Sequence, residues 1–127
     1  NLSKWHGVEV NDQGRVVKLS LDSNNLQGTI PEELGKLGAL TQLVLWGNNL
    51  SGHIPRQLGD LGALKTLDLS INRLEGPIPK EVGALSRLTE LLLFNNQLTG
   101  HIPQQLGNLS ALESLDLSWN KLDGESR

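Results

Sequence analysis

A repeat of 24 residues constrains this chain more than any other feature of its sequence. Each unit reads L-x-x-L-x-L-x-x-N-x-L-x-G-x-I-P-x-x-L-G-x-L, and the fifth stops after Gly124. The first apolar positions of the units are Val16, Leu40, Leu64, Leu88 and Leu112. Periods of this length are typical of solenoids, because one unit cannot bury its apolar face without a neighbour. The sequence therefore predicts a single stacked array of repeats.

Alternating apolar residues predict one short strand in every unit. In Leu43-x-Leu45 both leucines are expected to point inward, and Leu67-x-Leu69 repeats this pattern one unit later. These strands should pair in parallel, about 4.8 Å apart. The Ile-Pro pair that follows predicts a tight turn, because proline fixes φ and cannot continue a ladder. The Leu-Gly-x-Leu segment suits a short 3₁₀ turn.

Two positions that hold the same residue type in every repeat, here called columns, separate the strand from the turn. Asparagine follows the strand, where its amide can satisfy backbone groups and where stacked copies can form a ladder. Glycine comes next, at a bend that a Cβ atom would crowd. The columns are Asn24, Asn48, Asn72, Asn96 and Asn120, and Gly28, Gly52, Gly76, Gly100 and Gly124.

Composition excludes several classes of protein. The chain has 127 residues and a formal net charge of -3, which argues against a nucleic-acid binder. It has no cysteine, so disulfides, zinc-thiolate sites and thiol nucleophiles are excluded. Its longest apolar run, 91–94, is far shorter than the roughly 20 residues of a membrane span. The sequence begins with Asn1, so we expect any signal peptide to lie outside it.

These motifs resemble the plant-type leucine-rich repeat family over residues 16–124, and the G-x-I-P segment is the specific feature of that subclass. The resemblance implies an α/β leucine-rich-repeat solenoid of right-handed twist. Its parallel sheet would lie on the concave face, and 3₁₀ or other short turns on the convex face. Residues 1–15 resemble the N-terminal cap of that family, with Trp5 covering the first layer, and residues 16–127 carry the repeats.

The cap differs from that of secreted plant members, in which a cysteine usually follows the W-x-G-V-x segment. Val10 stands at that place here. This favours a cytoplasmic location, and an extracellular one stays open if a leader precedes the sequence. The cysteine-free cap also looks similar to leucine-rich repeats of algal and protist receptor-like proteins and of Roc-COR GTPases. No phosphate-binding G-x-x-x-x-G-K-[ST] motif is present in the sequence.

The last repeat has no polar helix after it to cover its leucines. We expect this layer to be partly open, which indicates either one piece of a longer protein or self-association through the uncapped repeat. The layer consists of Leu112, Leu115, Leu117 and Leu122.

The concave face carries the candidate binding site. Positions two, four, six and seven residues after the start of each unit should face this surface, and several hold apolar residues where solvent is expected. Exposed contiguous apolar area usually marks a contact surface, and tryptophan is favoured at hot spots. The alternative is that Trp46 and Phe94 lie flat over the sheet and only shield its hydrogen bonds. The candidate residues are Val44, Trp46, Asp68, Ile71, Leu92, Phe94, Asp116 and Trp119.

Other polar residues give weaker signals. His53 and His101 share a column two units apart, too far for one metal ion, and His6 lies in the cap, so no metal site is expected. Asp68 and Asp116 have the spacing of inverting glycosidases, but Asp is a common filler of this column. N-glycosylation sequons begin at Asn1, Asn49 and Asn108 and matter only in a secreted chain.

The sequence thus predicts a protein- or peptide-binding module that uses the concave face, without catalysis, a cofactor, nucleic-acid binding or membrane insertion. The resemblance implies that this module is part of a larger receptor-like or signalling protein that acts in defence or sensing. A structural or self-associating solenoid is one alternative. A secreted inhibitor of polysaccharide-degrading enzymes is another, since small plant members of the family have that role.

Overall fold

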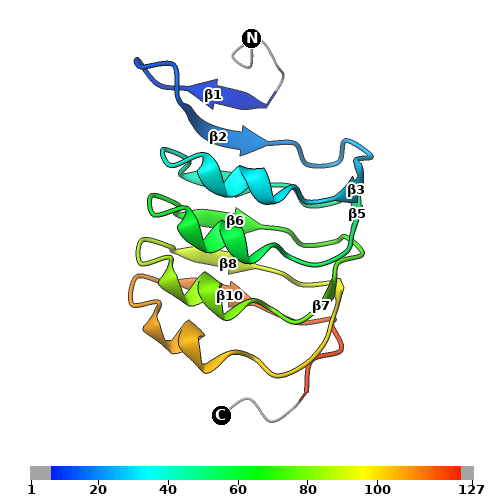
Figure 1. Ribbon diagram of the computed structural model, residues 1–127. Coiled ribbons are helices and arrows are strands. Elements are labelled where there is room, and N and C mark those ends of the chain that lie inside the picture. Colours follow the sequence, from blue (N-terminus) through cyan, green and yellow to red (C-terminus); the bar gives the residue numbers. More distant parts are fainter. Residues whose placement is uncertain (1–6, 124–127) are drawn as a thin grey trace.

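The computed structural model describes residues 7–123, which form a single stack of short strands and 3₁₀ helices (Figure 1). Trp5, His6, Asn1 and Gly124 lie outside the described residues. The elements are β1 (Val8–Val10), β2 (Val16–Ser20), β3 (Gln27–Thr29), η2 (Glu32–Lys36), β4 (Gln42–Val44), β5 (Asn49–Ser51), η3 (Arg56–Asp60), β6 (Thr66–Asp68), β7 (Glu75–Gly76), η4 (Lys80–Ala84), β8 (Glu90–Leu92), β9 (Gln97–Leu98), η5 (Gln104–Asn108) and β10 (Ser114–Asp116).

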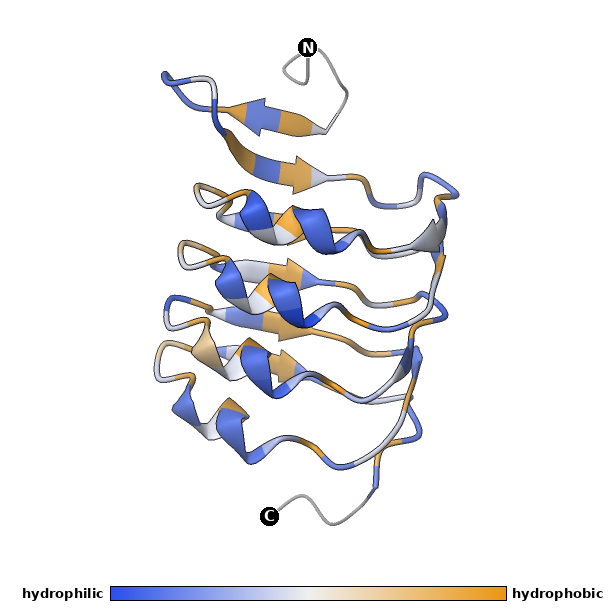
Figure 2. Cartoon of the chain, in the orientation of Figure 1, coloured by the Kyte–Doolittle hydropathy of each residue, from blue (hydrophilic) through white to orange (hydrophobic). Residues whose placement is uncertain are grey.

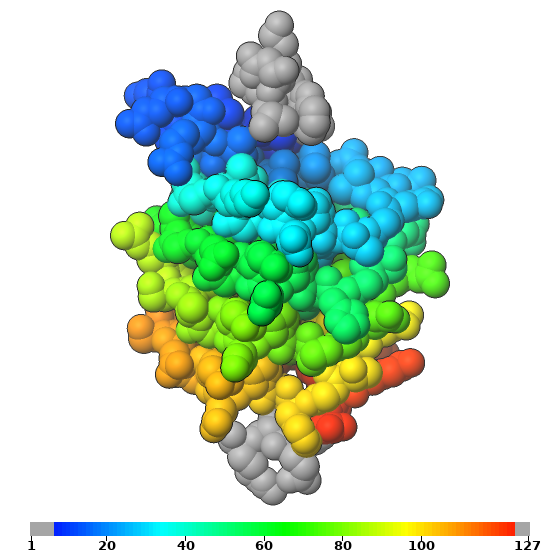
Figure 3. All heavy atoms as spheres, in the orientation of Figure 1, coloured from blue at the N-terminus to red at the C-terminus, as the bar shows by residue number. Residues whose placement is uncertain are grey.

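One six-stranded sheet runs the length of the stack in the order β1-β2-β4-β6-β8-β10. From β2 to β10 every pair is parallel, and Leu43, Leu67 and Leu91 are direct partners. Partners are therefore 24 residues apart, as the repeat predicts. At the other end β1 pairs antiparallel with β2. Figure 3 shows the repeats as successive bands that follow the order of the sequence.

The opposite side of the stack is made of the 3₁₀ helices η2 to η5, each of five residues and each preceded by proline. Between the strands and these helices lie two small sheets, β3–β5 and β7–β9. Their partners, for example Gln27 with Asn49, are 22 residues apart. No helix in the described range 7–123 has both the length and the apolar character that crossing a membrane requires.

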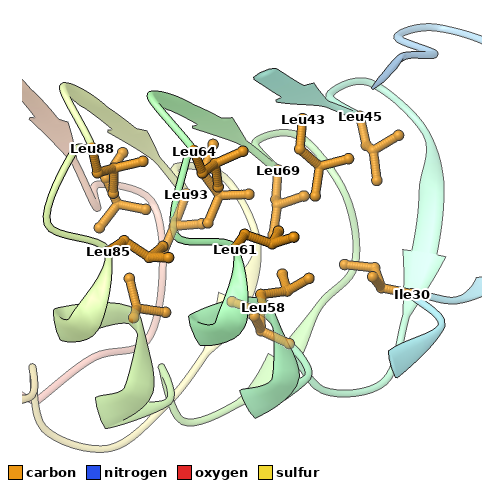
Figure 4. Packing of buried hydrophobic residues seen from close by; sticks show 14 of the residues in the cluster. Ile30, Leu43, Leu45, Leu58, Leu61, Leu64, Leu69, Leu85, Leu88 and Leu93 are labelled. Atoms are coloured by element: carbon orange, nitrogen blue, oxygen red, sulfur yellow. The ribbon is translucent and has the colours of Figure 1, made fainter. Parts of the chain in front are cut away.

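Leucines fill the space between the sheet and the 3₁₀ helices. Figure 4 shows Leu43 and Leu69 from the strand side meeting Leu58 and Leu61 from the η3 side. All four are completely buried. Figure 2 shows the same division by hydropathy, with hydrophilic residues prominent on the outer surface of the helices. Repeated leucines at 24-residue spacing thus give a continuous core, as expected for the stacked array that the repeat predicts.

The asparagine column binds the backbone of neighbouring repeats. Asn72 accepts a hydrogen bond from the amide of Leu50, and it donates to the carbonyls of Leu69 and, one repeat earlier, Leu45. Asn48, Asn96 and Asn120 repeat this pattern. The column therefore joins repeats through side-chain-to-backbone bonds, which satisfy carbonyl groups that the turn would otherwise leave unpaired.

The last leucine layer follows the sequence prediction, and the glycine column does so in part. A Cβ atom would be crowded at Gly52 and Gly76, but at Gly28 and Gly100 it would meet no atom closer than 3.8 Å. Gly52, Gly76 and Gly100 have φ angles of 77° to 80°, a region where side chains with a Cβ atom are strained. In the fifth repeat Leu112, Leu117 and Leu122 are only partly buried. Leu115 is 50% exposed, whereas Leu67 and Leu91 at the same position are fully buried.

Candidate functional site

The candidate site is the side of the six-stranded sheet that points away from the 3₁₀ helices, called the sheet face below. Side chains alternate along a strand, so the residues beside the core-facing leucines of β4 to β10 point to this side. Most of them are half-buried. They are Gln42, Val44 and Trp46; Thr66, Asp68 and Ser70; Glu90, Leu92 and Phe94; and Ser114, Asp116 and Ser118.

Apolar and acidic side chains alternate across the strands. Asp68 pairs with Val44 on one side and with Leu92 on the other, and Leu92 pairs with Asp116. The structure thus brings four candidate residues into one row in the order Val44, Asp68, Leu92, Asp116. It does not place the two apolar members side by side, because a carboxylate lies between them.

Trp46 and Phe94 occupy the next row and have Ser70 between them. The carbonyl of Ser70 accepts a hydrogen bond from Gly47, and Ile71 donates one to the carbonyl of Phe94. Ser70 is 1% exposed, whereas Ser118, which has a neighbouring strand on one side only, is exposed. The two aromatic residues are themselves half-buried. Each aromatic residue is therefore partly exposed to solvent and partly covered by its neighbours.

The two aspartates are held by the serines that follow them. The Oδ1 atom of Asp68 accepts from the Oγ of Ser70 at 2.6 Å and from its backbone nitrogen at 3.1 Å. Asp116 makes the same bonds with Ser118, at 2.6 and 3.0 Å. The side-chain bond from Ser118, and then its backbone bond, lower the pKa of Asp116 because both stabilise the carboxylate. Both carboxylates are thus oriented by the chain itself.

The column at position seven adopts left-handed backbone in every repeat. Ile71 has φ 56° and Trp119 has φ 58°, although such angles are unusual for bulky or β-branched residues. Ile71 is 41% exposed and Trp119 is 81% exposed, so both side chains project from the edge of the sheet face. Our sequence analysis placed both residues in the site but missed this conformation. The signal was Gly47 and Asn95 in the same column, because these residue types favour it.

The remaining candidates lie elsewhere. His101 is exposed, and its Nδ1 atom lies 3.4 Å from a carboxylate oxygen of Asp123. Among residues 7–123 no three His, Cys, Asp or Glu side chains are grouped as metal ligands would be. Asn49 and Asn108, which begin two of the sequons, are exposed at β5 and at the end of η5. These positions are away from the sheet face.

Comparison with known families decides the identity of the fold. The family profile described as "Leucine-rich repeat region" matches residues 12–126. The chain belongs to the leucine-rich repeat family. This confirms the resemblance found in the sequence, including the solenoid fold with a parallel sheet and short 3₁₀ turns. No curated protein is a significant match to this chain.

The chain is similar to solved structures of plant leucine-rich repeat proteins. The BIR2 ectodomain from Arabidopsis thaliana has a TM-score of 0.92 at 39% identity, over 97% of this chain and 66% of that chain. A chain of the BIR3–SERK2 complex from Arabidopsis thaliana has a TM-score of 0.90 at 42% identity, over 96% of this chain and 66% of that chain. The plant peptide hormone receptor RGFR1 in complex with RGF2 has a TM-score of 0.85 at 43% identity, over 95% of this chain and 18% of that chain.

The chain is therefore a leucine-rich repeat array that is similar in fold and sequence to these plant proteins. It spans about two-thirds of the length of the BIR2 chain and a smaller part of the hormone receptor. Two of these three structures are complexes, one with a second protein and one with RGF2. The resemblance to repeats fused to GTPases stays a prediction.

Proposed function

We propose that this chain is a recognition module that binds a protein or peptide through its sheet face, as part of a larger receptor-like or signalling protein. The observation that carries the proposal is the exposure of Ile71 and Trp119 from strained, left-handed backbone at the edge of that face. Such conformations cost about 1–3 kcal/mol each and are concentrated at ligand clamps and switches. Large apolar side chains kept in solvent at this cost suit a contact with a partner.

Further support comes from the half-buried residues of the same face. Trp46 and Phe94 have free surface beside the exposed edge residues, and Val44 and Leu92 lie in the adjacent row. Aromatic anchors surrounded by polar residues are the usual composition of a binding hot spot. We propose no catalysis by this face, because its two aspartates are each bonded to a serine of their own repeat.

The test is a double substitution of the aromatic pair. Peptides that bind the unchanged chain are first selected from a displayed library. They are then titrated into the double variant Trp46→Ala with Phe94→Ala, and we expect the free energy of binding to weaken by more than about 1 kcal/mol. Leu34→Ala with Ile102→Ala is the matched control, because these half-buried residues lie on the other side of the core. Circular dichroism checks the fold of both variants. Unchanged affinity of the aromatic variant would exclude the pair from the site.

Self-association is the alternative that a specific observation favours. Leu115 is half-exposed in β10, the edge strand of the described sheet, and unpaired strand edges are templates for pairing. Sedimentation at several concentrations tests it. A monomer at every concentration removes this alternative, whereas association that Leu115→Glu abolishes would support it. A secreted inhibitor of polysaccharide-degrading enzymes remains an expectation from the family resemblance alone.

A further inference from the structure

The sheet face has an uneven distribution of charge. Its positions two, four and six from β4 to β10 include three carboxylates, those of Asp68, Glu90 and Asp116, and no lysine or arginine. The basic residue at position two of the first repeat, Lys18, lies 3.7 Å from a carboxylate oxygen of Glu9 in β1. The open part of the face is therefore acidic, although the whole chain has a formal charge of only -3.

The two aspartates present a regular pair of acceptors. Each uses Oδ1 for its serine, and within residues 7–123 no hydrogen bond involves the Oδ2 atom of either. They lie two strands apart in one row, which corresponds to about 10 Å. Val44 and Leu92 alternate with them in that row. A ligand that runs across the strands thus meets an apolar and an acidic position in turn.

This spacing selects the conformation of a ligand. In a polyproline II segment every third side chain lies on the same face, and three residues advance about 9.3 Å. In a β-strand, side chains on one face repeat about every 6.6 Å, which does not match the two-strand step. An extended ligand of polyproline II type can therefore contact both aspartates with residues i and i+3. The residues between them would lie near Leu92.

We propose that the sheet face binds an extended cationic segment in which arginine or lysine recurs every third residue with apolar residues between. The proposal rests on the proposed recognition function and gives the chemical class of its partner. Charge complementarity favours this occupant, because carboxylates that are already oriented attract a basic side chain without further ordering of the protein. A second copy of the chain is a poor occupant, since two sheet faces together would bring like charges into contact.

The test uses a synthetic peptide, three repeats of Leu-Arg-Pro, titrated by calorimetry at about 0.05 M salt, where surface charge is only moderately screened. Two peptides serve as controls: one with glutamate in place of arginine, and one of the same composition with arginine at every fourth position. Asp68→Asn with Asp116→Asn is the protein variant, because asparagine Oδ1 can still accept the serine bonds. Asp12→Asn with Asp60→Asn has the same change of charge at exposed sites away from this face and is the matched control.

We expect the arginine peptide to bind more tightly than both control peptides. The Asp68/Asp116 variant should bind it about fivefold more weakly, and the Asp12/Asp60 variant should bind it as the unchanged chain does. The proposal is overturned if the arginine peptide does not bind, if the glutamate peptide binds equally well, or if both double variants behave alike. In each of these cases the recognition function would still be supported if the Trp46/Phe94 variant lost its affinity for the peptides selected from the library. Failure of the cationic-ligand proposal can therefore be distinguished from failure of the recognition function.

Discussion

At the residue scale, Asn72 is one of the three buried asparagines that join neighbouring repeats among residues 7–123. It is buried and bonds to the backbone of both its own and the preceding repeat. We expect Asn72→Ala to lower the free energy of unfolding by about 2–4 kcal/mol, because several buried backbone groups lose their partner. Asn120→Ala is the control, since that residue is only partly buried. Urea unfolding measures both, and equal losses would contradict the dependence on burial.

The hydrogen bond from the Ser118 hydroxyl to Asp116 can be tested separately. The pKa of Asp116 is lowered in the folded chain. The stability that this carboxylate contributes is therefore present above the pKa that Asp116 has in the unfolded chain, and it is lost as the pH falls through the lower pKa of the folded chain. We expect Ser118→Ala to raise the pKa of Asp116 toward its ordinary value, because the side-chain bond is the larger cause and the backbone bond remains. Carboxyl NMR titration measures this shift. Ser114→Ala is the control, and an unchanged pKa in Ser118→Ala would contradict the assignment.

Sequence reasoning at this scale succeeded where one residue type recurs for one physical reason. The asparagine column was predicted from its amide and its place after the strand, and its bonds to the backbone confirm this. The left-handed column was not predicted, because Ile71 and Trp119 are residue types that avoid this conformation. The binding role of the candidate residues on the sheet face remains a prediction.

At the scale of elements, the glycine inside each 3₁₀ helix controls how closely the helices stack. A Cβ atom on Gly59 would lie 2.6 Å from the carbonyl oxygen of Glu81 in the next repeat, whereas one on Gly107 would meet nothing within 4 Å. We therefore expect Gly59→Ala to destabilise the chain by about 1–3 kcal/mol through overpacking. Gly107→Ala should cost little. Thermal unfolding measures both, and equal stability of the two variants would contradict this account.

The main strands and the 3₁₀ helices were predictable, and the second set of strands was not. The apolar residues Leu43 and Leu45 alternate with their neighbours and predicted a strand over 43–45. The observed strand, β4, covers Gln42–Val44 and so lies one residue earlier. By contrast, β3 and β7 contain glycine and have no alternating apolar pattern. They form because carbonyl and amide groups of adjacent repeats are already in register, and this follows from the stacking rather than from local residue type.

At the scale of the whole molecule, stability comes from contacts between nearest repeats. Within residues 7–123 each leucine layer of the core lies against the next layer along the stack (Figure 4). In such arrays the stability of a unit depends on how many neighbours it has. The open layer around Leu115 should therefore be the least stable part of the described repeats, and the layers of β4 to β8 the most stable.

Amide hydrogen exchange tests this gradient on matched bonds. The amide of Thr66 donates to Thr41 at 3.1 Å, and that of Ser114 donates to Thr89 at 3.0 Å, so the two bonds have the same place in their repeats. We expect Thr66 to exchange more slowly, because β6 is covered on both sides and β10 on one side only. Leu91→Ala, which removes a fully buried side chain, should speed the exchange of Ser114 more than that of Thr66. Equal exchange at the two sites in the unchanged chain would mean that the repeats unfold as one unit, and binding would then be coupled to the stability of the entire stack.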